Sequence, residues 1–316
     1  SDAVLHLADN PKATMSDLLK FIQGPDFPTG GIIYDKNAIA EAYASGHGAI
    51  TMRAKAEVKE KKSAAGREEY FIEINEIPYQ VNKSELIIKI AELVTDKKID
   101  GIRDVRDESD KDGLSIIIEL KNNVPPQKVL NQLFQHTDLQ KDFHLNMIAL
   151  ANGIQPELMS LKDVLEAYLK HRNEVVRRRA QFDLKKAEER AHILMGLSKA
   201  LSEIDKVIET IKKSKDRDDA KKNLMAKFKF SELQTNAILE MRLQTLANLE
   251  RQKIDDELKE KKALIAELQI LLKSPAKILK IIKDEISELR EKYNNPRRTK
   301  LVATGLKEFK EEDLIP

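Results

Sequence analysis

The amino-acid sequence predicts an α+β protein: a mixed α/β domain, then a long antiparallel pair of helices that carries a small all-helical tip. Between Glu157 and Ser274 the chain has no proline and one glycine, Gly196. Because proline and glycine are the residues that most often interrupt helices, this stretch indicates long helices. Before it, short alternating apolar runs are separated by turn-forming residues, which is typical of a mixed domain.

The helices predicted in the first half are short. Thr14 and Asp17 resemble a capping box for one of them, and Gly24–Gly31 cannot be helical and is expected to form a shaped loop. The predicted helices span Asp2–Ala8, Met15–Ile22, Asn37–Ser45, Lys83–Thr95, and a segment that starts at Pro125-Pro126 and ends at Gln135.

The predicted strands follow from alternation. Between Ile50 and Val58 every second residue is apolar, so one strand with an apolar and a polar face is expected. Tyr70–Ile77 would return beside it as a hairpin, and Leu114–Leu120 is a β-branched strand after a turn at Asp110–Gly113.

The second half is predicted to be helical from Leu161 to about Lys213. Apolar residues seven apart (Tyr168, Val175, Phe182) indicate a seam for a partner helix. The expected further elements are a helix over Asp216–Phe228, a Ser231/Gln234 capping box that opens Glu232–Leu243, and a returning helix that restarts at Ser274-Pro275 and continues to Asn294.

Composition and charge exclude several classes of protein. The chain has no cysteine, which excludes disulfides and thiolate metal sites. No apolar run approaches the roughly 18 residues that span a bilayer, and no signal-peptide pattern opens the chain, so a cytoplasmic protein is expected. Residues 1–156 hold 19 basic and 24 acidic side chains, and residues 157–316 hold 36 and 29. Any anion site must therefore be a local patch.

Seven segments, in order along nearly the whole chain, resemble the A subunit of bacterial DNA gyrase, a type IIA topoisomerase. The related A subunit of topoisomerase IV shares much of this pattern, but the residues at positions 80–83 and 146–150 resemble gyrase more. The segments are Gly24–Gly31, Glu76–Lys83, Arg106–Gly113, His171–Arg179, Arg190–Leu194, Ala237–Gln244 and Arg297–Thr299.

This resemblance implies a domain organisation. Residues 1–156, rejoined by 295–316, would be the tower domain. Residues 157–194 and 248–294 would be the coiled-coil arm, and 195–247 the C-gate tip where two copies meet. The complete enzyme would use ATP to pass one duplex through a transient double-strand break and so introduce negative supercoils. The expected partners are a second copy, double-stranded DNA and the gyrase B subunit in an A2B2 complex on the chromosome.

The resemblance also implies what this chain lacks. The family's nucleophilic tyrosine follows an arginine, and none of the six tyrosines here does, so this chain alone should not cut DNA. No cofactor is expected in it, because Mg²⁺ and ATP belong to the partner subunit in that family. Two alternatives remain: a topoisomerase IV subunit, whose main output is decatenation, and a structural coiled-coil dimerisation module that never touches DNA.

Four residues are candidates for contact with the DNA backbone. Arg53 and Lys55 lie on the polar side of a predicted strand near His47, which sits between two glycines that allow close approach of a phosphate. Lys83 lies at a helix start, where free N–H groups favour an anion. The alternative is a solvated strand face and an ordinary first-turn lysine.

The tip helix is predicted to dimerise. It is too apolar to bury its side chains against one hairpin alone, so a second copy is the expected partner. The predicted interface residues are Ala237, Ile238, Met241, Arg242 and Leu243.

Two charged motifs are expected to be structural. Arg177-Arg178-Arg179 cover most of a helical turn and cannot all point one way, so packing and solvation are expected rather than DNA steering. The stretch from Glu108 to Glu119 has EF-hand-like spacing, but strand residues follow Gly113, so a hairpin turn is expected and no metal site.

Overall fold

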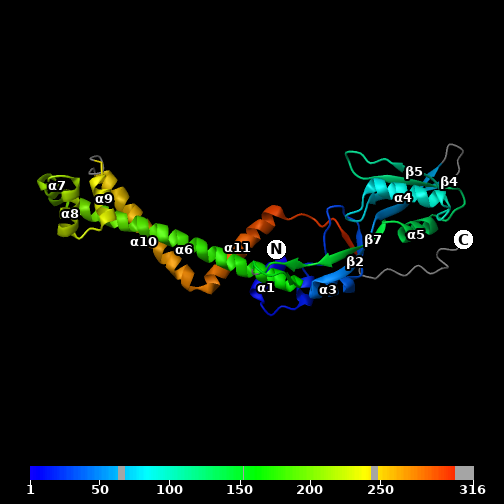
Figure 1. The fold of residues 1–316 in the computed structure, drawn as a ribbon, viewed down its shortest axis with the longest axis horizontal. Helices are drawn as coiled ribbons and strands as arrows, with labels where there is room; N and C mark the ends of the chain where they lie inside the picture. The colour runs from blue at the N-terminus through cyan, green and yellow to red at the C-terminus, as the bar shows by residue number, and fades with distance from the viewer. Residues whose placement is uncertain (63–67, 152, 243–247, 303–316) are drawn as a thin grey trace. The chain divides into compact units, whose positions relative to one another are not determined.

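The computed structural model describes residues 1–62, 68–151, 153–242 and 248–302, which fall into two compact units (Figure 1). Unit 1 consists of residues 1–169 and 289–316, and unit 2 of residues 170–288. Unit 1 mixes helices and strands and unit 2 is helical, so the predicted α+β class is confirmed. The finer division into tower, arm and tip stays a prediction.

The described residues of unit 1 form two four-stranded sheets and a short hairpin. The first has the order β10-β1-β2-β7, in which β1 and β10 are parallel and the other pairs are antiparallel. The second has the order β3-β4-β6-β5 and is antiparallel throughout. The strands are β1 (Ile32–Tyr34), β2 (His47–Arg53), β3 (Lys55–Lys62), β4 (Glu68–Glu76), β5 (Ile102–Asp107), β6 (Ile116–Leu120), β7 (Gln140–Asn146), the hairpin β8 (Ile148–Ala149) with β9 (Glu157–Leu158), and β10 (Lys300–Val302).

The two sheets share one extended segment, which the sequence analysis predicted as a single strand. β2 ends at Arg53 and β3 begins at Lys55, and between them Ala54 is buried and donates its N–H to the carbonyl of Leu139 at 2.7 Å. The apolar alternation is therefore real, but it serves two cores. Ile50 and Met52 are buried in the core of the first sheet and Ala54 in that of the second, whereas Val58 at the end of the pattern is exposed. The predicted hairpin with the following strand is confirmed as β3–β4.

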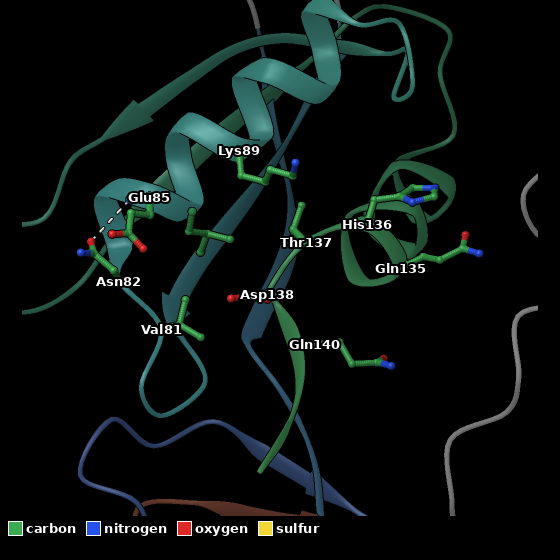
Figure 2. Close-up of a pocket in the computed structure, with 10 residues that line it drawn as sticks. Val81, Asn82, Glu85, Lys89, Gln135, His136, Thr137, Asp138 and Gln140 are labelled. Atoms are coloured by element: carbon green, nitrogen blue, oxygen red, sulfur yellow. Dashed lines mark hydrogen bonds between the residues drawn. The ribbon is translucent and has the colours of Figure 1, made fainter. Parts of the chain in front are cut away.

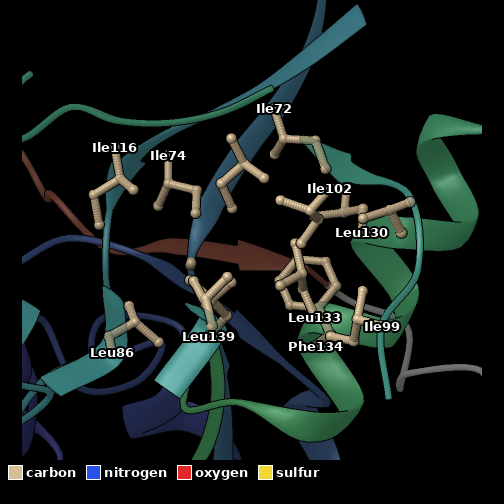
Figure 3. Close-up of a cluster of buried hydrophobic side chains, with 14 of the residues drawn as sticks. Ile72, Ile74, Leu86, Ile99, Ile102, Ile116, Leu130, Leu133, Phe134 and Leu139 are labelled. Carbon is tan, nitrogen blue, oxygen red and sulfur yellow. The ribbon is translucent and has the colours of Figure 1, made fainter. Parts of the chain in front are cut away.

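The larger core lies on one face of the second sheet (Figure 3). Isoleucines from β4 and β6 meet α4 (Lys83–Thr95) and α5 (Pro126–His136) there. Fully burying one such side chain contributes about 1.5–3 kcal/mol, so this cluster supplies much of the stability of unit 1. Its members include Ile72, Ile74, Ile116, Ile118, Leu86, Ile90, Leu93, Val129, Leu130 and Leu133.

The helices of unit 1 match most of the predicted boundaries because their caps are local. The Thr14/Asp17 capping box forms, and the Asn82 side chain accepts from the N–H groups of Ser84 and Glu85 to open α4. The remaining helices are α1 (Asp2–Asp9), α2 (Met15–Leu19) and α3 (Lys36–Ser45).

The strands β1, β5, β7, β8, β9 and β10 were not predicted. Each is short or rich in charge: β5 reads IRDVRD and β7 reads QKDFHLN. They form because partner strands supply their hydrogen bonds, a property that single-segment alternation does not reveal.

Unit 2 is built on long antiparallel helices. As residue numbers rise along α6, those of its partners fall: Arg172 bonds Glu285 and Arg190 bonds Glu257. The helices are α6 (Leu161–Ser202, beginning in unit 1), α7 (Ile204–Lys213), α8 (Arg217–Phe228), α9 (Glu232–Leu239), α10 (Asn248–Lys273) and α11 (Pro275–Tyr293, ending in unit 1).

Two predicted helix boundaries in unit 2 are corrected. The helix expected to run to Lys213 breaks at Glu203, because α7 must turn to pack Val207 against α8. The helix expected to reach Leu243 ends at Leu239, and Leu243 lies outside the described residues. The predicted restart at Ser274-Pro275 is confirmed, and Ser274 caps α11 by accepting from the N–H of Lys277 at 3.4 Å.

Candidate nucleic-acid interface and helical tip

The Gly24–Gly31 loop is fastened by the segment 297–299. The Asp26 carboxylate accepts from the N–H groups of Arg298 (3.1 Å) and Thr299 (2.9 Å), and the buried Thr299 hydroxyl accepts from the N–H of Phe27 at 2.7 Å. Arg297 donates to the carbonyls of Gly24 and Pro25. Two motifs 270 residues apart in sequence thus form one structural junction, next to the β1–β10 pairing.

This junction prefers Asp26 in its ionised form. Burial pushes the pKa of the carboxyl upward, but the N–H groups of Thr299 and Arg298 and the charge of Arg297 outweigh it, so the pKa is lowered from its ordinary value of 3.8. The other end of the loop is held by Glu76, whose carboxylate accepts from the N–H of Gly31. Gly30 has a φ of +73°, a conformation that favours glycine, and a Cβ at this position would displace the Glu76 carboxylate that binds Gly31.

Arg53 is held inside unit 1. Its Nε donates to Gln140 Oε1 at 2.6 Å, and its guanidinium carbon lies 4.6 Å from the ring centroid of Phe134 and 5.3 Å from that of Tyr34. Burial lowers the pKa of this guanidinium, while Tyr34 works in the opposite sense. Gln140 belongs to β7 of the first sheet, and Phe134 belongs to α5, which packs on the second sheet. Arg53 therefore links the first sheet to the helix that covers the second.

The other three predicted DNA contacts lie apart in the structure. Lys83 forms an ion pair with Asp107 (Nζ–Oδ2 2.6 Å), and the Lys83 ammonium holds the pKa of Asp107 down at about 2. Lys55 and His47 are exposed, the first at the start of β3 and the second at the far end of β2 from Arg53. Of the four, Lys55 and His47 are thus the side chains that point to solvent without a charged protein partner in the described part of the chain.

A cavity of about 510 Å³ lies beside the first half of α4 (Figure 2). Its walls carry both charges, with Glu85 and Lys89 from α4 and His136 and Asp138 from the end of α5 and the segment after it. The buried Thr137 hydroxyl in the wall already donates a hydrogen bond to the carbonyl of Leu133 and accepts one from the N–H of Leu139. The cavity therefore favours no single class of ligand.

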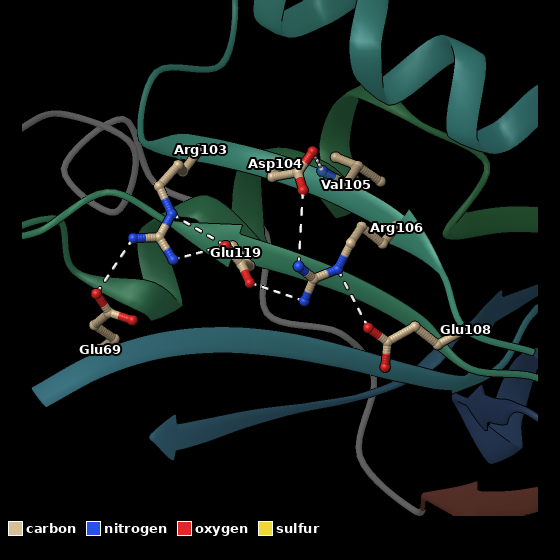
Figure 4. Close-up of polar contacts among 7 residues, drawn as sticks. All are labelled: Glu69, Arg103, Asp104, Val105, Arg106, Glu108 and Glu119. Atoms are coloured by element: carbon tan, nitrogen blue, oxygen red, sulfur yellow. Dashed lines mark hydrogen bonds and ion pairs between the residues drawn. The ribbon is translucent and has the colours of Figure 1, made fainter. Parts of the chain in front are cut away.

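The outer face of the second sheet carries a network of ion pairs (Figure 4). Arg103 bonds Glu69 and Glu119, and Arg106 bonds Glu119 and Glu108. The hydrogen bond from Arg103 is the main cause of a lowered pKa at Glu119, which burial opposes. Because both guanidinium groups are committed to carboxylates, this face is unsuited to binding phosphate.

The EF-hand-like segment forms the predicted hairpin turn between β5 and β6. Asp110 and Gly113 pair as an isolated bridge, and the Asp110 carboxylate accepts from the N–H of Asp112 at 2.8 Å. Within the described residues, no group of three His, Asp or Glu side chains is arranged to hold a metal ion.

The predicted packing role of the arginine run agrees with its contacts in unit 2. Arg179 and Arg172 share the carboxylate of Glu285 (2.7 and 2.6 Å). Burial raises the pKa of Glu285, but these two hydrogen bonds outweigh it and the pKa is lowered. Arg178 pairs with Glu174 on its own helix, and Arg177 reaches the carbonyl of Leu272 at the end of α10 at 3.5 Å.

Gly196 marks the place where α9 docks on α6. A Cβ at this position would lie 2.6–2.7 Å from Cγ and Cβ of Gln234. Gln234 completes the predicted capping box with Ser231 and also donates to the carbonyl of His192 at 2.8 Å, while the His192 ring lies 2.6 Å from the Ser231 hydroxyl. The single glycine of the helical stretch is therefore a contact point between helices.

The tip has its own core, and this core changes how the predicted interface is understood. Ile238 is only 3% exposed and packs with Phe228, Phe230 and Leu224, so its side chain is a member of that core and has almost no surface to offer a partner. Ala237 and Met241 are half-buried and Arg242 is exposed, whereas Leu243 lies outside the described residues.

Sequence reasoning missed Leu233, which is 63% exposed on α9. Leu233 and Ala237 are four residues apart on α9, so they form one stripe beside the buried Ile238, and Met241 follows just after the helix ends at Leu239. The spacing alone could have identified this stripe, but separating it from the core stripe required the packing of α8 against α9.

No described helix is both long and apolar enough to cross a membrane.

Comparison with known proteins agrees with the motifs. Residues 1–287 match the family described as the A subunit of DNA gyrase and topoisomerase IV. The chain is 46% identical over 315 residues to the DNA gyrase A subunit of Dehalogenimonas lykanthroporepellens, covering 100% of this chain and 38% of the relative. The corresponding protein of Clostridium acetobutylicum is 48% identical (99% and 37%), and that of Halalkalibacterium halodurans 49% (100% and 37%). The chain thus spans less than two-fifths of the length of these curated relatives, and it belongs to the family of DNA gyrase and topoisomerase IV A subunits.

Proposed function

We propose that this chain is the part of a DNA gyrase A subunit that supports the cleaved duplex and closes the exit gate behind the transported one. Unit 1 would act as the tower beneath bent DNA, and the tip of unit 2 would form the C-gate dimer interface. The observation that carries the proposal is the antiparallel helix pair with a compact tip whose α9 displays an apolar stripe of the exposed Leu233 and the half-buried Ala237. The same machinery in a topoisomerase IV would give decatenation, but the relatives compared above are gyrase subunits.

The stripe supports a homodimer because a lone tip leaves it in water. Exposed contiguous apolar surface of this kind is typical of interaction sites. In the complete enzyme this dimer would join two B subunits in an A2B2 complex, with ATP and Mg²⁺ bound by the B subunit. These 316 residues alone would neither relax nor cleave DNA, because no tyrosine in them follows an arginine.

Sedimentation equilibrium of the whole chain tests the dimer. The wild-type chain should be dimeric at micromolar concentrations, and Leu233→Asp together with Ala237→Asp should make it monomeric while the helical content is retained. Ile270→Asp is the matched control, because Ile270 is 52% exposed on α10, away from the tip helix. A monomeric wild type, or a dimer that survives the double substitution, would refute the C-gate assignment.

Salt-dependent binding of duplex DNA tests the tower. Each lost phosphate contact should lower the slope of log affinity against log salt by about 0.9. The His47→Ala, Lys55→Ala double variant should lower it, because both side chains are exposed. The Lys12→Ala, Lys111→Ala control, also exposed in unit 1, should not. Equal slopes in all three proteins would favour the structural dimerisation module.

A further inference from the structure

The bend between α10 and α11 carries an uninterrupted run of positive charge. From residue 268 to residue 283 the charged residues are Lys273, Lys277, Lys280 and Lys283, with no acidic side chain between Glu267 and Asp284. On α6, residues 175–182 hold three arginines and no acid. Elsewhere on these helices acidic and basic residues are interspersed.

The fold brings these two runs together. Arg177 Nη1 reaches the carbonyl of Leu272, so the middle of the α6 run lies beside the end of α10. The helix then breaks at Ser274 and restarts at Pro275, and Figure 1 shows the bend at this point. The first turn of α11 adds the positive end of a helix dipole to the same place.

Part of this charge is neutralised within unit 2 and part is not. Arg178 and Arg179 are paired with Glu174 and Glu285. The ammonium groups of Lys273, Lys277 and Lys280 are exposed and have no ion pair or hydrogen bond with any residue that the structure describes. Arg177, Lys273, Lys277 and Lys280 are called the elbow patch below.

The free lysines of α11 are displayed in one direction. Lys277 and Lys280 are three residues apart and therefore share a helix face. The opposite stripe of α11 is buried: Ile278 is 0% exposed, Ile282 1% and Ile286 4%. The apolar stripe anchors α11 in its unit and leaves the lysines directed to solvent.

We propose that the elbow patch binds the phosphate backbone of double-stranded DNA, as a contact separate from the tower. The inference rests on the proposed function, in which a duplex passes unit 2 on its way out. Closely spaced cations with no acidic residue between them in the sequence match the dense phosphate charge of a duplex. Single-strand binding sites add aromatic side chains on which bases stack. The patch has none, and the ring of Phe182 on α6 is engaged by Lys186 at 4.5 Å. The contact carries no sequence information and weakens with salt.

The test compares two triple variants of the whole chain that remove the same charge. The elbow variant is Lys273→Gln, Lys277→Gln, Lys280→Gln. The control is Lys253→Gln, Lys259→Gln, Lys262→Gln, three exposed lysines of α10 that lie among carboxylates. Affinity for a random-sequence duplex is measured at several salt concentrations, and circular dichroism and sedimentation confirm that both variants keep their helices and their association state.

The elbow variant should lose up to about 0.9 of log–log slope for each lysine that contacts a phosphate, and the control should keep the wild-type slope. An elbow variant that binds like the wild type overturns the inference, and so does an equal loss in the control. If the slope falls in the His47/Lys55 variant alone, the elbow contact is refuted and the tower contact stands. If it falls in the elbow variant alone, the elbow contact stands and the tower contact is refuted. A wild-type chain that binds no duplex overturns both.

Discussion

Substitution of Gly196 by alanine should destabilise the tip, although alanine is the better helix former. In an exposed helix, glycine to alanine stabilises by about 1 kcal/mol. At this position the new Cβ would lie 2.6 Å from Cγ and 2.7 Å from Cβ of Gln234. The Cβ of Gln234 is fixed to the backbone of α9, so α9 itself has to move to make room. Overpacking of this kind costs about 1–3 kcal/mol.

The movement would also strain the hydrogen bonds that Gln234 makes to the N–H of Ser231 and to the carbonyl of His192. Each such bond contributes about 0.5–1.5 kcal/mol. Together these effects exceed the gain in helix propensity, and we expect α9 to open more easily by about 1–3 kcal/mol.

Native-state hydrogen exchange of the α9 amides measures this opening free energy directly. Gln181→Ala on the exposed side of α6 is the control for propensity and should change little. In the double variant with Gln234→Ala, removal of Cγ and Cδ should make the two substitutions less than additive. Slower exchange in α9 of the Gly196→Ala variant would refute the argument, since it would mean that propensity outweighs the contact.

Three further predictions concern unit 1. Asp26→Asn should lower the melting temperature at neutral pH. Because the folded pKa of Asp26 is lowered, its stabilisation is present above the ordinary value of 3.8 and is lost as the pH falls through the folded value; the difference from wild type in thermal scans should therefore shrink below pH 3.8, and a constant difference would contradict this. Lys83→Met should raise the pKa of Asp107 from about 2 toward 3.8, measured by NMR titration of the carboxyl carbon, and an unchanged value would show that Lys83 does not hold the pair. Arg53→Met should destabilise unit 1 in urea unfolding. Arg53→Lys should not restore the stability, because lysine lacks the planar group that bonds Gln140 and stacks on Phe134. Wild-type stability in either variant would contradict this structural role and favour the DNA contact predicted from the sequence.

Elements with a local signal were predicted well. The helix Lys83–Thr95, the capping boxes at Thr14 and Ser231, and the restart at Ser274 all depend on residues within a few positions of one another. Elements that need a distant partner were missed or misjudged. β10 forms only because β1 lies beside it, and the chain passes from β2 to β3 at Ala54, whose N–H is accepted by the carbonyl of Leu139, 85 residues later in the sequence.

The candidate site residues divide in the same way. The sequence identified charged and apolar side chains correctly by type, but it could not tell which were already occupied. Arg53, Lys83 and Ile238 are engaged within the chain, whereas His47 and Lys55 are exposed and have no charged partner among the residues that the structure describes. A side chain's partner is set by residues tens or hundreds of positions away, which no local pattern records.

The sequence by itself determined the α+β class, the long helical stretch, its interruption at Ser274-Pro275 and the family to which the chain is similar, because caps, periodicity and motifs are written in neighbouring residues. Only the tertiary structure decided that the strand after His47 serves two sheets, that Gly196 receives Gln234, and that two basic runs about 95 residues apart lie side by side. These depend on packing between distant segments, where burial and the pairing of charges determine which groups are satisfied and which stay free.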